Sequence, residues 1–321
     1  MRRLVATIFL ISGLLIPVAA LAQGALGAIT GSVVDPSGAS IAGALITITS
    51  TQTGVATTAK TSSAGYYRVP VPVGNYRVEA TQQGFQTAVV DHVVVSVAQV
   101  VTANISLQVG STKQTVTVTG QSSLLTPNTA EVGASITPEE FQALPIEVDD
   151  GGRDIETFIF SSLPGAVGNS YQGSINGGQQ FSAGIVIDGV AVARYDMNGG
   201  ALAEFMPTAD SIGEFKVQEA NYSAEFDNTG GGIMNFAMKS GTNQFHGSLF
   251  EYLQNPIFNA AGLLNNAFGT PKDNTRQNDF GGAFGGPIKK DRTFFFATYE
   301  GNRFRNFAFG STRTLPTPAM K

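Results

Sequence analysis

Cysteine and tryptophan are absent from this sequence, and histidine occurs only at His92 and His246. Without cysteine the chain can form no disulfide framework, thiolate zinc site or cysteine nucleophile. The two histidines lie too far apart in sequence for the H-E-x-x-H pattern of a zinc-binding helix. We therefore expect no metal site and no cofactor, and we expect each histidine to lie at a surface or an interface.

Charged residues are scarce as well, at 13% of the 321 residues against a typical share of about 25%. This share excludes a coiled coil, and a hydrophobic content of 42% excludes disorder throughout. Glycine is abundant instead: its 38 residues are about 12% of the chain against a typical ~7%, which favours turn-rich β structure. The chain is long enough for two or more domains with their own cores.

The N-terminus, residues 1–22, has the pattern of a secretory signal peptide. Met1-Arg2-Arg3 is a short positive region, Leu4–Ile16 is apolar, and Ala20-Leu21-Ala22 is a small-residue cleavage site. A membrane anchor is the alternative, but the apolar run is shorter than the ~20 residues of a span, and Pro17 ends it. We expect cleavage after residue 22, and thus export of the mature chain.

The mature chain is acidic. Loss of Arg2 and Arg3 leaves 17 basic and 24 acidic residues, a net charge of −7, which argues against nucleic acid as a partner. No other stretch approaches 18 uninterrupted apolar residues, so a bundle of membrane-spanning helices is excluded. Membrane β-barrel strands carry a weaker signal and are not excluded.

From Gly27 to Val109, β-rich runs alternate with turn residues at ~10-residue spacing, which is typical of a β-sandwich. In one run, Ile46 and Ile48 fall on one face and Thr47 on the other, the period of a half-buried strand. The expected strands are Ile29–Val34, Ala44–Thr49, Val55–Thr61, Tyr66–Val69, Tyr76–Ala80, Phe85–Val90, Val93–Val97 and Val100–Leu107.

Two runs in this segment carry a family resemblance: ITGSVVDPSGASIAGALITITSTQTG at residues 29–54 and TSSAGYYRVPVPVGNYRVEATQQGF at residues 61–85. They resemble the carboxypeptidase regulatory-like domain, a transthyretin-like sandwich. The resemblance implies an accessory module without catalytic residues, of a kind sometimes assigned to carbohydrate binding. Aromatic side chains here either stack on a sugar or fill the core. They are Tyr66, Tyr67, Tyr76 and Phe85.

Residues 110–129 form a polar connection with one short β-prone run. This run is either a last strand of the sandwich, part of an ordinary linker, or an unpaired segment that adds to the sheet of a partner. In its position it resembles the TonB box of outer-membrane receptors, and the resemblance implies TonB as the partner. The run consists of Thr115, Val116, Thr117, Val118 and Thr119.

Residues 130–241 have a mixed α and β pattern. Thr137-Pro138-Glu139-Glu140 predicts a capping box at the start of a short helix. Apolar residues at helical spacing predict a second helix over residues 155–163. Asp188-Gly189 predicts a hairpin between residues 185–187 and 190–192. Further strands are expected at residues 214–218, where Phe215 and Val217 alternate with polar residues, and at Ile233–Met238.

The same stretch resembles the plug domain of TonB-dependent receptors, most closely the Oar-like branch. The motifs are Ala143-Leu144-Pro145, Ile185-Val186-Ile187-Asp188-Gly189-Val190, SIGEFKVQEANYSAEF from Ser211, and GGGIMNFAMKSGTNQFHGSLFEY from Gly230. One departure concerns Arg153. Residues 147–152 intervene before it, where this branch follows Leu-Pro with a compact Asn-Gly-Arg. The conformation and role of that loop are left open by the resemblance.

From residue 242 onward the chain is rich in aromatic residues and glycine. In Thr293–Glu300, Phe295, Ala297 and Tyr299 share one parity, while Thr298 and Glu300 share the other, as in a strand with one lipid face and one wet face. Residues 280–286 and 247–253 are expected as its preceding strands. They resemble the first strands of the receptor barrel; a soluble hairpin packed on the plug is the alternative.

The expected fold is therefore mainly β: a transthyretin-like sandwich (27–109), an α+β plug (130–241) and the first strands of an outer-membrane barrel (242–321). About three strands cannot close a barrel, because open edges in lipid leave backbone groups unpaired and the smallest single-chain barrels use ~8 strands. We therefore expect the N-terminal part of a longer receptor, or a truncated gene product.

No catalytic constellation is present in the sequence. The acidic pairs Glu139-Glu140 and Asp149-Asp150 are explained by capping or solvated loops, and Lys239-Ser240 lacks the glycine of a phosphate-binding loop. The resemblance implies a receptor for TonB-coupled uptake of an unknown extracellular substrate, held in outer-membrane lipid with its sandwich in the periplasm. The alternative is a soluble periplasmic or surface binding module, with carbohydrate as a candidate ligand.

Overall fold

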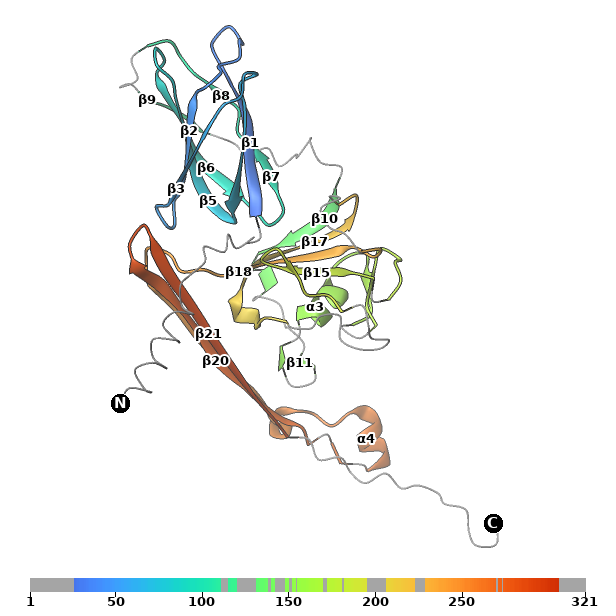
Figure 1. Ribbon diagram of the computed structural model, residues 1–321. Helices are drawn as coiled ribbons and strands as arrows, with labels where there is room; N and C mark the ends of the chain where they lie inside the picture. Colours follow the sequence, from blue (N-terminus) through green and yellow to red (C-terminus); the bar gives the residue numbers. More distant parts are fainter. Residues whose placement is uncertain are drawn as a thin grey trace, which may run out of the picture.

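The computed structural model of the chain describes residues 26–110, 115–119, 131–137, 140–141, 148–149, 152–153, 155–169, 172–180, 182–194, 206–222, 229–269, 271–272 and 274–305. The predicted signal peptide lies outside the described residues. The described chain is mainly β and forms an N-terminal unit, a central unit and a long C-terminal sheet (Figure 1). As predicted, β structure dominates.

The N-terminal unit consists of two sheets with one shared core. One sheet has the order β4-β1-β7, with β8 also paired to β1, and the other has the order β3-β2-β5-β6-β9. Side chains of both sheets, among them Ile29, Ile48 and Val78, form a single buried cluster. The strands are β1 (Leu26–Val34), β2 (Leu45–Ser50), β3 (Ala56–Lys60), β4 (Tyr66–Pro72), β5 (Gly74–Thr81), β6 (Thr87–Val95), β7 (Val100–Thr102), β8 (Ile105–Ser106) and β9 (Thr115–Thr119).

Two of the expected strands are one strand in the structure. Strand β6 runs through the predicted break at Asp91 and His92 because a β-bulge places both residues opposite Arg77 of β5. His92 takes a left-handed backbone conformation there, with φ of 60°. Arg77 Nε and Asp91 Oδ1 lie 3.6 Å apart across the bulge. The prediction of two separate strands was therefore wrong, since a bulge keeps the ladder continuous.

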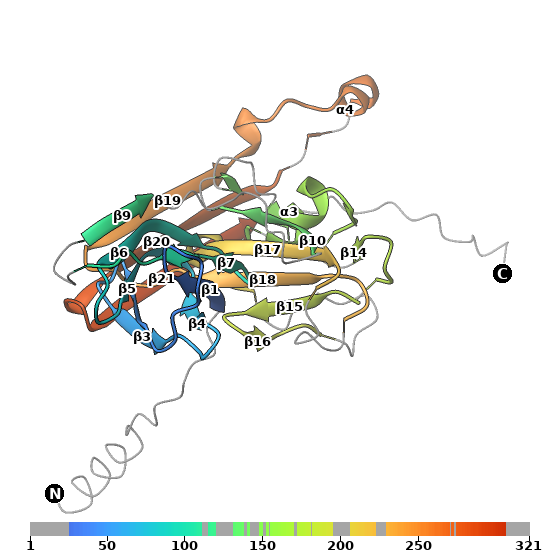
Figure 2. The same cartoon turned by 90° about the horizontal axis from the view of Figure 1, so that it is seen from above.

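The central unit contains a five-stranded sheet of order β10-β17-β18-β15-β16, seen from above in Figure 2. Helix α3 packs on one face of this sheet, and Phe158 of the helix meets Phe215 of β17 edge-on. The elements are β10 (Val132–Ile136), β11 (Val148–Asp149), β12 (Gly152–Arg153), α3 (Ile155–Ser162), β13 (Ala166–Val167), β14 (Ser174–Ile175), β15 (Gly184–Ile187), β16 (Val190–Ala191), η1 (Ala209–Ser211), β17 (Ile212–Ala220) and β18 (Ile233–Met238).

Local sequence signals in this unit are confirmed. The backbone N–H of Thr137 donates to the Glu140 carboxylate at 2.9 Å, and the Thr137 hydroxyl accepts from the backbone N–H of Glu140, which completes the capping box. The helix at residues 155–163 is α3. Asp188 and Gly189 both have positive φ between β15 and β16, as a tight hairpin requires.

The alternation expected in β17 is only half correct. Phe215 and Val217 face the core, but Glu214 and Gln218 on the other parity are buried too. Gln218 accepts a hydrogen bond from the side-chain amide of Asn235 at 2.6 Å, and Glu214 meets the N-terminal unit. Because both faces of this strand are covered, it does not present the solvated face that its polar residues suggested.

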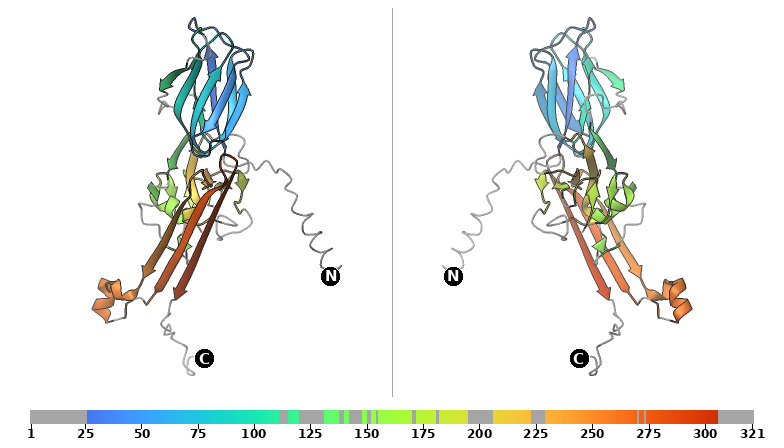
Figure 3. Two further views of the ribbon diagram at one scale, coloured as in Figure 1. Left: turned by 90° about the vertical axis from the view of Figure 1, so that its left-hand side faces the viewer. Right: turned by 90° about the vertical axis from the view of Figure 1, so that its right-hand side faces the viewer.

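The C-terminal sheet is an antiparallel meander in which β20 pairs with β19 on one side and β21 on the other. It lies beside the central unit in both side views of Figure 3. The expected three strands are confirmed and extend further than predicted. No helix in the described part of the chain has the length and apolar character to cross a bilayer. The elements are β19 (His246–Gln254), η2 (Pro256–Phe258), α4 (Leu263–Phe268), β20 (Arg276–Lys289) and β21 (Thr293–Arg305).

Candidate functional site

Arg153 connects the central unit to the C-terminal sheet. Its guanidinium forms a close ion pair with Asp210 of η1. Its Nη2 lies 3.4 Å from a carboxylate oxygen of Glu300 in β21, and its Nε lies 3.5 Å from Asp279 in β20. The Arg153 side chain is only 7% exposed and Asp279 only 1%. One buried cation therefore lies among three carboxylates contributed by two parts of the chain.

Aromatic rings of β19 cover the same guanidinium. The Arg153 Cζ atom lies 4.2 Å from the ring centre of Phe250 and 5.0 Å from that of Tyr252. A cation over an aromatic face gains most where water is excluded. All three strands of the C-terminal sheet thus contribute to what we name the Arg153 centre: Arg153, Asp210, Phe250, Tyr252, Asp279 and Glu300.

The charges of the Arg153 centre are not balanced within it. Burial lowers the pKa of Arg153, but the hydrogen bond to Asp210 and the charge of Glu300 outweigh burial and raise that pKa above its ordinary value. The carboxyl groups of Asp279 and Glu300 hydrogen-bond to one another beside the guanidinium. A buried carboxylate without its cation is strongly unfavourable. Loss of Arg153 would therefore leave three buried acidic side chains without a cation.

The described residues of the loop before Arg153 form β structure. Val148 pairs with Arg153 and Asp149 with Gly152, so β11 and β12 form a short hairpin. The second strand of this hairpin carries Arg153 toward the C-terminal sheet. The sequence indicated that Glu300 lies on a wet face, but it gave no signal that Asp279, Asp210 and Arg153 would meet it there.

The predicted partner strand, residues 115–119, is strand β9. It pairs in parallel with β6, Thr115 opposite Thr87 and Thr119 opposite Asp91, at the edge of the five-stranded sheet. Of the three readings left open by the sequence, the structure shows a last strand, so the segment is not unpaired. Among the described residues no strand pairs with the outer edge of β9. Contact with TonB stays a prediction.

Two of the aromatic residues expected either to bind sugar or to fill the core are core residues. The Tyr67 hydroxyl donates to the carbonyl of Ala103 at 2.6 Å, and the Tyr76 hydroxyl donates to that of Pro72 at 2.7 Å. Burial raises the pKa of Tyr76 to about 12 and raises that of Tyr67 further. Phe85 packs partly against the same core, and Tyr66 is 62% exposed.

The two histidines and Asp188, which the sequence analysis considered, make contacts that belong to the fold. Both histidines are exposed: His92 lies in the β6 bulge, and His246 stacks on Phe296. Asp188 accepts a hydrogen bond from the backbone N–H of Met238 at 3.0 Å, which ties the β15–β16 turn to β18. In the part of the chain that the structure describes, no three His, Asp or Glu side chains are arranged to hold a metal ion.

Two domain families match the chain. Residues 28–108 match the carboxypeptidase regulatory-like domain, and residues 237–321 match an outer membrane beta barrel domain. The TonB-dependent transporter Oar of Myxococcus xanthus is 29% identical over 317 residues, which are 95% of this chain. The chain spans 29% of the length of that transporter.

Solved structures resemble the chain more distantly. The siderophore receptor PirA from Acinetobacter baumannii is 23% identical, with 54% of this chain and 24% of that chain covered and a TM-score of 0.39. A hydroxyquinol 1,2-dioxygenase from Pseudomonas putida is 10% identical, with 28% and 59% covered and a TM-score of 0.23. TM-scores of this size carry no inference about function.

Proposed function

We propose that this chain, a relative of the TonB-dependent transporters over nearly all of its length, is the N-terminal part of an outer-membrane receptor for energy-coupled uptake. In this proposal the N-terminal unit lies in the periplasm, the central unit is the plug, and the C-terminal sheet is the start of the barrel. The observation that carries the proposal is the Arg153 centre, which joins the plug to the inner face of the sheet.

The two faces of the C-terminal sheet have opposite chemistry. The face toward the plug carries Asp279, Glu300 and Asn302, whereas most side chains of the opposite face are apolar, with Glu251, Asn278 and Arg303 toward its α4 end. Leu249 is 92% exposed and Tyr299 67% exposed on that opposite face. Strands of outer-membrane barrels alternate between lipid-facing and lumen-facing residues in this way. The exposed apolar face therefore supports contact with outer-membrane lipid.

The edges of the sheet support a longer barrel. Strand β19 and strand β21 each pair on one side only, with β20, among the described residues. In a bilayer, backbone donors and acceptors at such edges need further strands as partners. This chain spans 29% of the Oar transporter, and a receptor of that length has enough further sequence for those strands.

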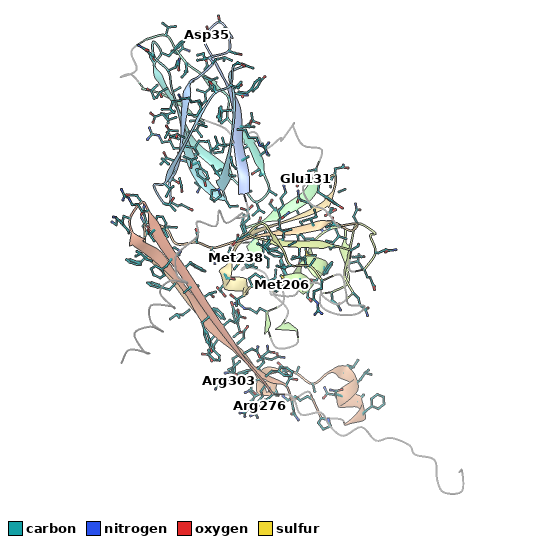
Figure 4. The ribbon with its side chains drawn as sticks, viewed as in Figure 1. Asp35, Glu131, Met206, Met238, Arg276 and Arg303 are labelled. Carbon is teal, nitrogen blue, oxygen red and sulfur yellow. The ribbon has the colours of Figure 1, made fainter. Side chains whose placement is uncertain are left out.

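The two ends of the sheet differ in their neighbours. The turn at residues 290–292 lies beside the N-terminal unit, whereas Arg276 and Arg303 lie at the far end, toward α4 (Figure 4). In the proposed receptor the first end faces the periplasm and the second faces the outside. An extracellular substrate enters from that outer end and meets the plug inside the barrel.

The outer edge of β9 is the proposed contact for TonB. An added strand would gain backbone hydrogen bonds from this edge, which is the general mode of strand addition. Inner-membrane energy would then reach the receptor through β9, and the plug would move or remodel to let the substrate pass.

Cross-linking in cells tests this function without knowledge of the substrate. Because residues 1–321 contain no cysteine, Val116→Cys introduces a single thiol there. Any cysteine beyond residue 321 is replaced by serine, and TonB variants carry the second thiol. We expect a disulfide-linked receptor–TonB species that is lost when Val118→Pro is added. A control with cysteine at exposed Tyr66 is expected to give no such species. Equal cross-linking at both positions contradicts the assignment of β9.

A further inference from the structure

The N-terminal unit contacts both other parts of the chain through two of its turns. These are the β2–β3 turn, residues 51–55, and the β6–β7 turn, residues 96–99. Both lie at the end of the unit that faces the central unit and the C-terminal sheet (Figure 1). The unit therefore spans the junction between them rather than extending freely from its linker.

The β2–β3 turn binds Asn243. The backbone N–H of Asn243 donates to the carbonyl of Gln52 at 3.0 Å, and its side-chain amide donates to the carbonyl of Thr53 at 2.7 Å. The close approach needs the glycine at position 54, because a Cβ there would overlap the Asp291 carboxylate. This contact consists of neutral donors and backbone carbonyls.

Asn243 is itself fixed to the C-terminal sheet. Its side-chain amide donates to Asp291 at 2.7 Å, and the backbone N–H of Asp291 donates to its side-chain oxygen at 2.9 Å. Asp291 lies in the β20–β21 turn. Two residues before Asn243, a Cβ at Gly241 would overlap the backbone of Phe295 and Gly286. The contact at the β2–β3 turn is therefore a contact with the barrel.

The β6–β7 turn binds the plug instead. The carboxylate of Glu214 in β17 accepts hydrogen bonds from the Ser96 hydroxyl and the Val97 backbone N–H. Glu214 is 8% exposed, and burial raises its pKa above the ordinary value despite these bonds. Hydrogen bonds to a buried carboxylate are roughly twice as strong as neutral ones. Each contact has two hydrogen bonds, and those to the ionised carboxylate of Glu214 are individually the stronger.

We infer that the N-terminal unit is a latch, a unit that contacts both the plug and the barrel and can release one of them. When β9 is pulled, the unit moves with the plug, and its contact with Asn243 of the barrel breaks. This inference rests on the proposed function, in which β9 receives the pull. Strand β9 pairs with β6, and β6 ends at Val95, directly before Ser96 and Val97. Tension on β9 thus reaches Glu214 of the plug through a single strand.

Single-molecule pulling tests the latch without TonB or substrate. The full-length receptor is held in a phosphatidylcholine–phosphatidylglycerol bilayer, any cysteine beyond residue 321 is replaced by serine, and a click handle at position 116 is pulled. We expect Asn243→Ala to lower the force of the first rupture. The same rupture force in wild type and Asn243→Ala would overturn the inference.

Disulfides locate the contact that breaks. We expect a Thr53→Cys/Asn243→Cys disulfide to remove the first rupture and a reductant to restore it. A Ser96→Cys/Glu214→Cys disulfide, the matched control, is expected to leave the first rupture at the wild-type force. If the second disulfide removes the rupture and the first does not, the unit stays with the barrel and the latch is wrong. Failure of TonB cross-linking at β9 would leave these rupture forces unchanged, so the two proposals fail separately.

Discussion

Arg153 Nη2 lies 3.4 Å from Glu300 Oε2, although 147 positions separate the two residues in the sequence. One residue belongs to a short hairpin of the central unit and the other to the last strand of the C-terminal sheet. A buried ion pair of this kind stabilises its surroundings weakly as a pair, but loss of one partner leaves an uncompensated charge. The position of the central unit against the C-terminal sheet therefore depends on Arg153 itself.

Arg153→Ala is expected to destabilise the packing of the central unit on the C-terminal sheet by about 3–5 kcal/mol, the range for removal of one partner of a buried ion pair. Three carboxylates would lose their shared cation. Urea unfolding of the full-length receptor measures the effect. Arg292→Ala, at an exposed arginine of the β20–β21 turn, is the matched control and should change stability by less than about 0.5 kcal/mol. Equal effects of the two substitutions would contradict the role of Arg153.

Asp210→Asn is expected to reduce stability more than Asp279→Asn. Asp210 holds the closest ion pair with Arg153, whereas Asp279 lies 3.5 Å from Arg153 Nε and shares a hydrogen bond with Glu300. An amide at position 279 removes one of the excess negative charges and keeps the shape of the side chain. Urea unfolding of the two variants gives the order directly, and the reverse order would show that the guanidinium depends mainly on Asp279.

Alkaline conditions are expected to weaken the N-terminal unit. The pKa of Tyr76 is raised from 10.0 to about 12 by burial, so the folded state keeps a proton that the unfolded state releases. The contribution is complete below pH 10 and is lost as the pH rises from 10 through 12. Unfolding followed by circular dichroism at pH 8 to 12 measures the loss. Tyr76→Phe should make this part of the profile less steep, with buried Tyr67 supplying the remaining slope, while Tyr66→Phe, at an exposed position, should leave it unchanged.

Val116→Pro combined with Val118→Pro is expected to abolish TonB-dependent uptake and leave ligand binding by the full receptor intact. Proline lacks the backbone N–H that a strand donates, and the two positions share one parity, so two donors to the same edge are lost. Val116→Ala combined with Val118→Ala keeps both N–H groups and should keep uptake. Uptake by the proline variant at the wild-type rate would show that β9 has no role in coupling the receptor to TonB.

Short-range chemistry was readable in the sequence. The hairpin at Asp188-Gly189, the capping box at Thr137 and the turn before β21 each depend on a few neighbouring residues, and each is present in the structure. The parity of β21 correctly placed Glu300 on the face opposite Tyr299, but the central unit covers that face at Glu300. These features were predictable because the residues that determine them are adjacent in the chain.

Long-range relationships were not readable. The Arg153 centre joins residues from a hairpin, a 3-10 helix and three strands, and no local pattern marks residues that meet only after the plug and the sheet pack together. Glu214 was expected on a polar face because the covering N-terminal unit lies more than a hundred residues earlier. The bulge in β6 was missed because its partner residue, Arg77, belongs to another strand.

An immunoblot of fractionated native cells, with antibody raised against residues 27–109, tests the central claim most directly. The account predicts a band in the outer membrane several times larger than the 33.5 kDa of this chain. A soluble periplasmic band near 33.5 kDa would contradict it and would favour a binding module that acts without a barrel.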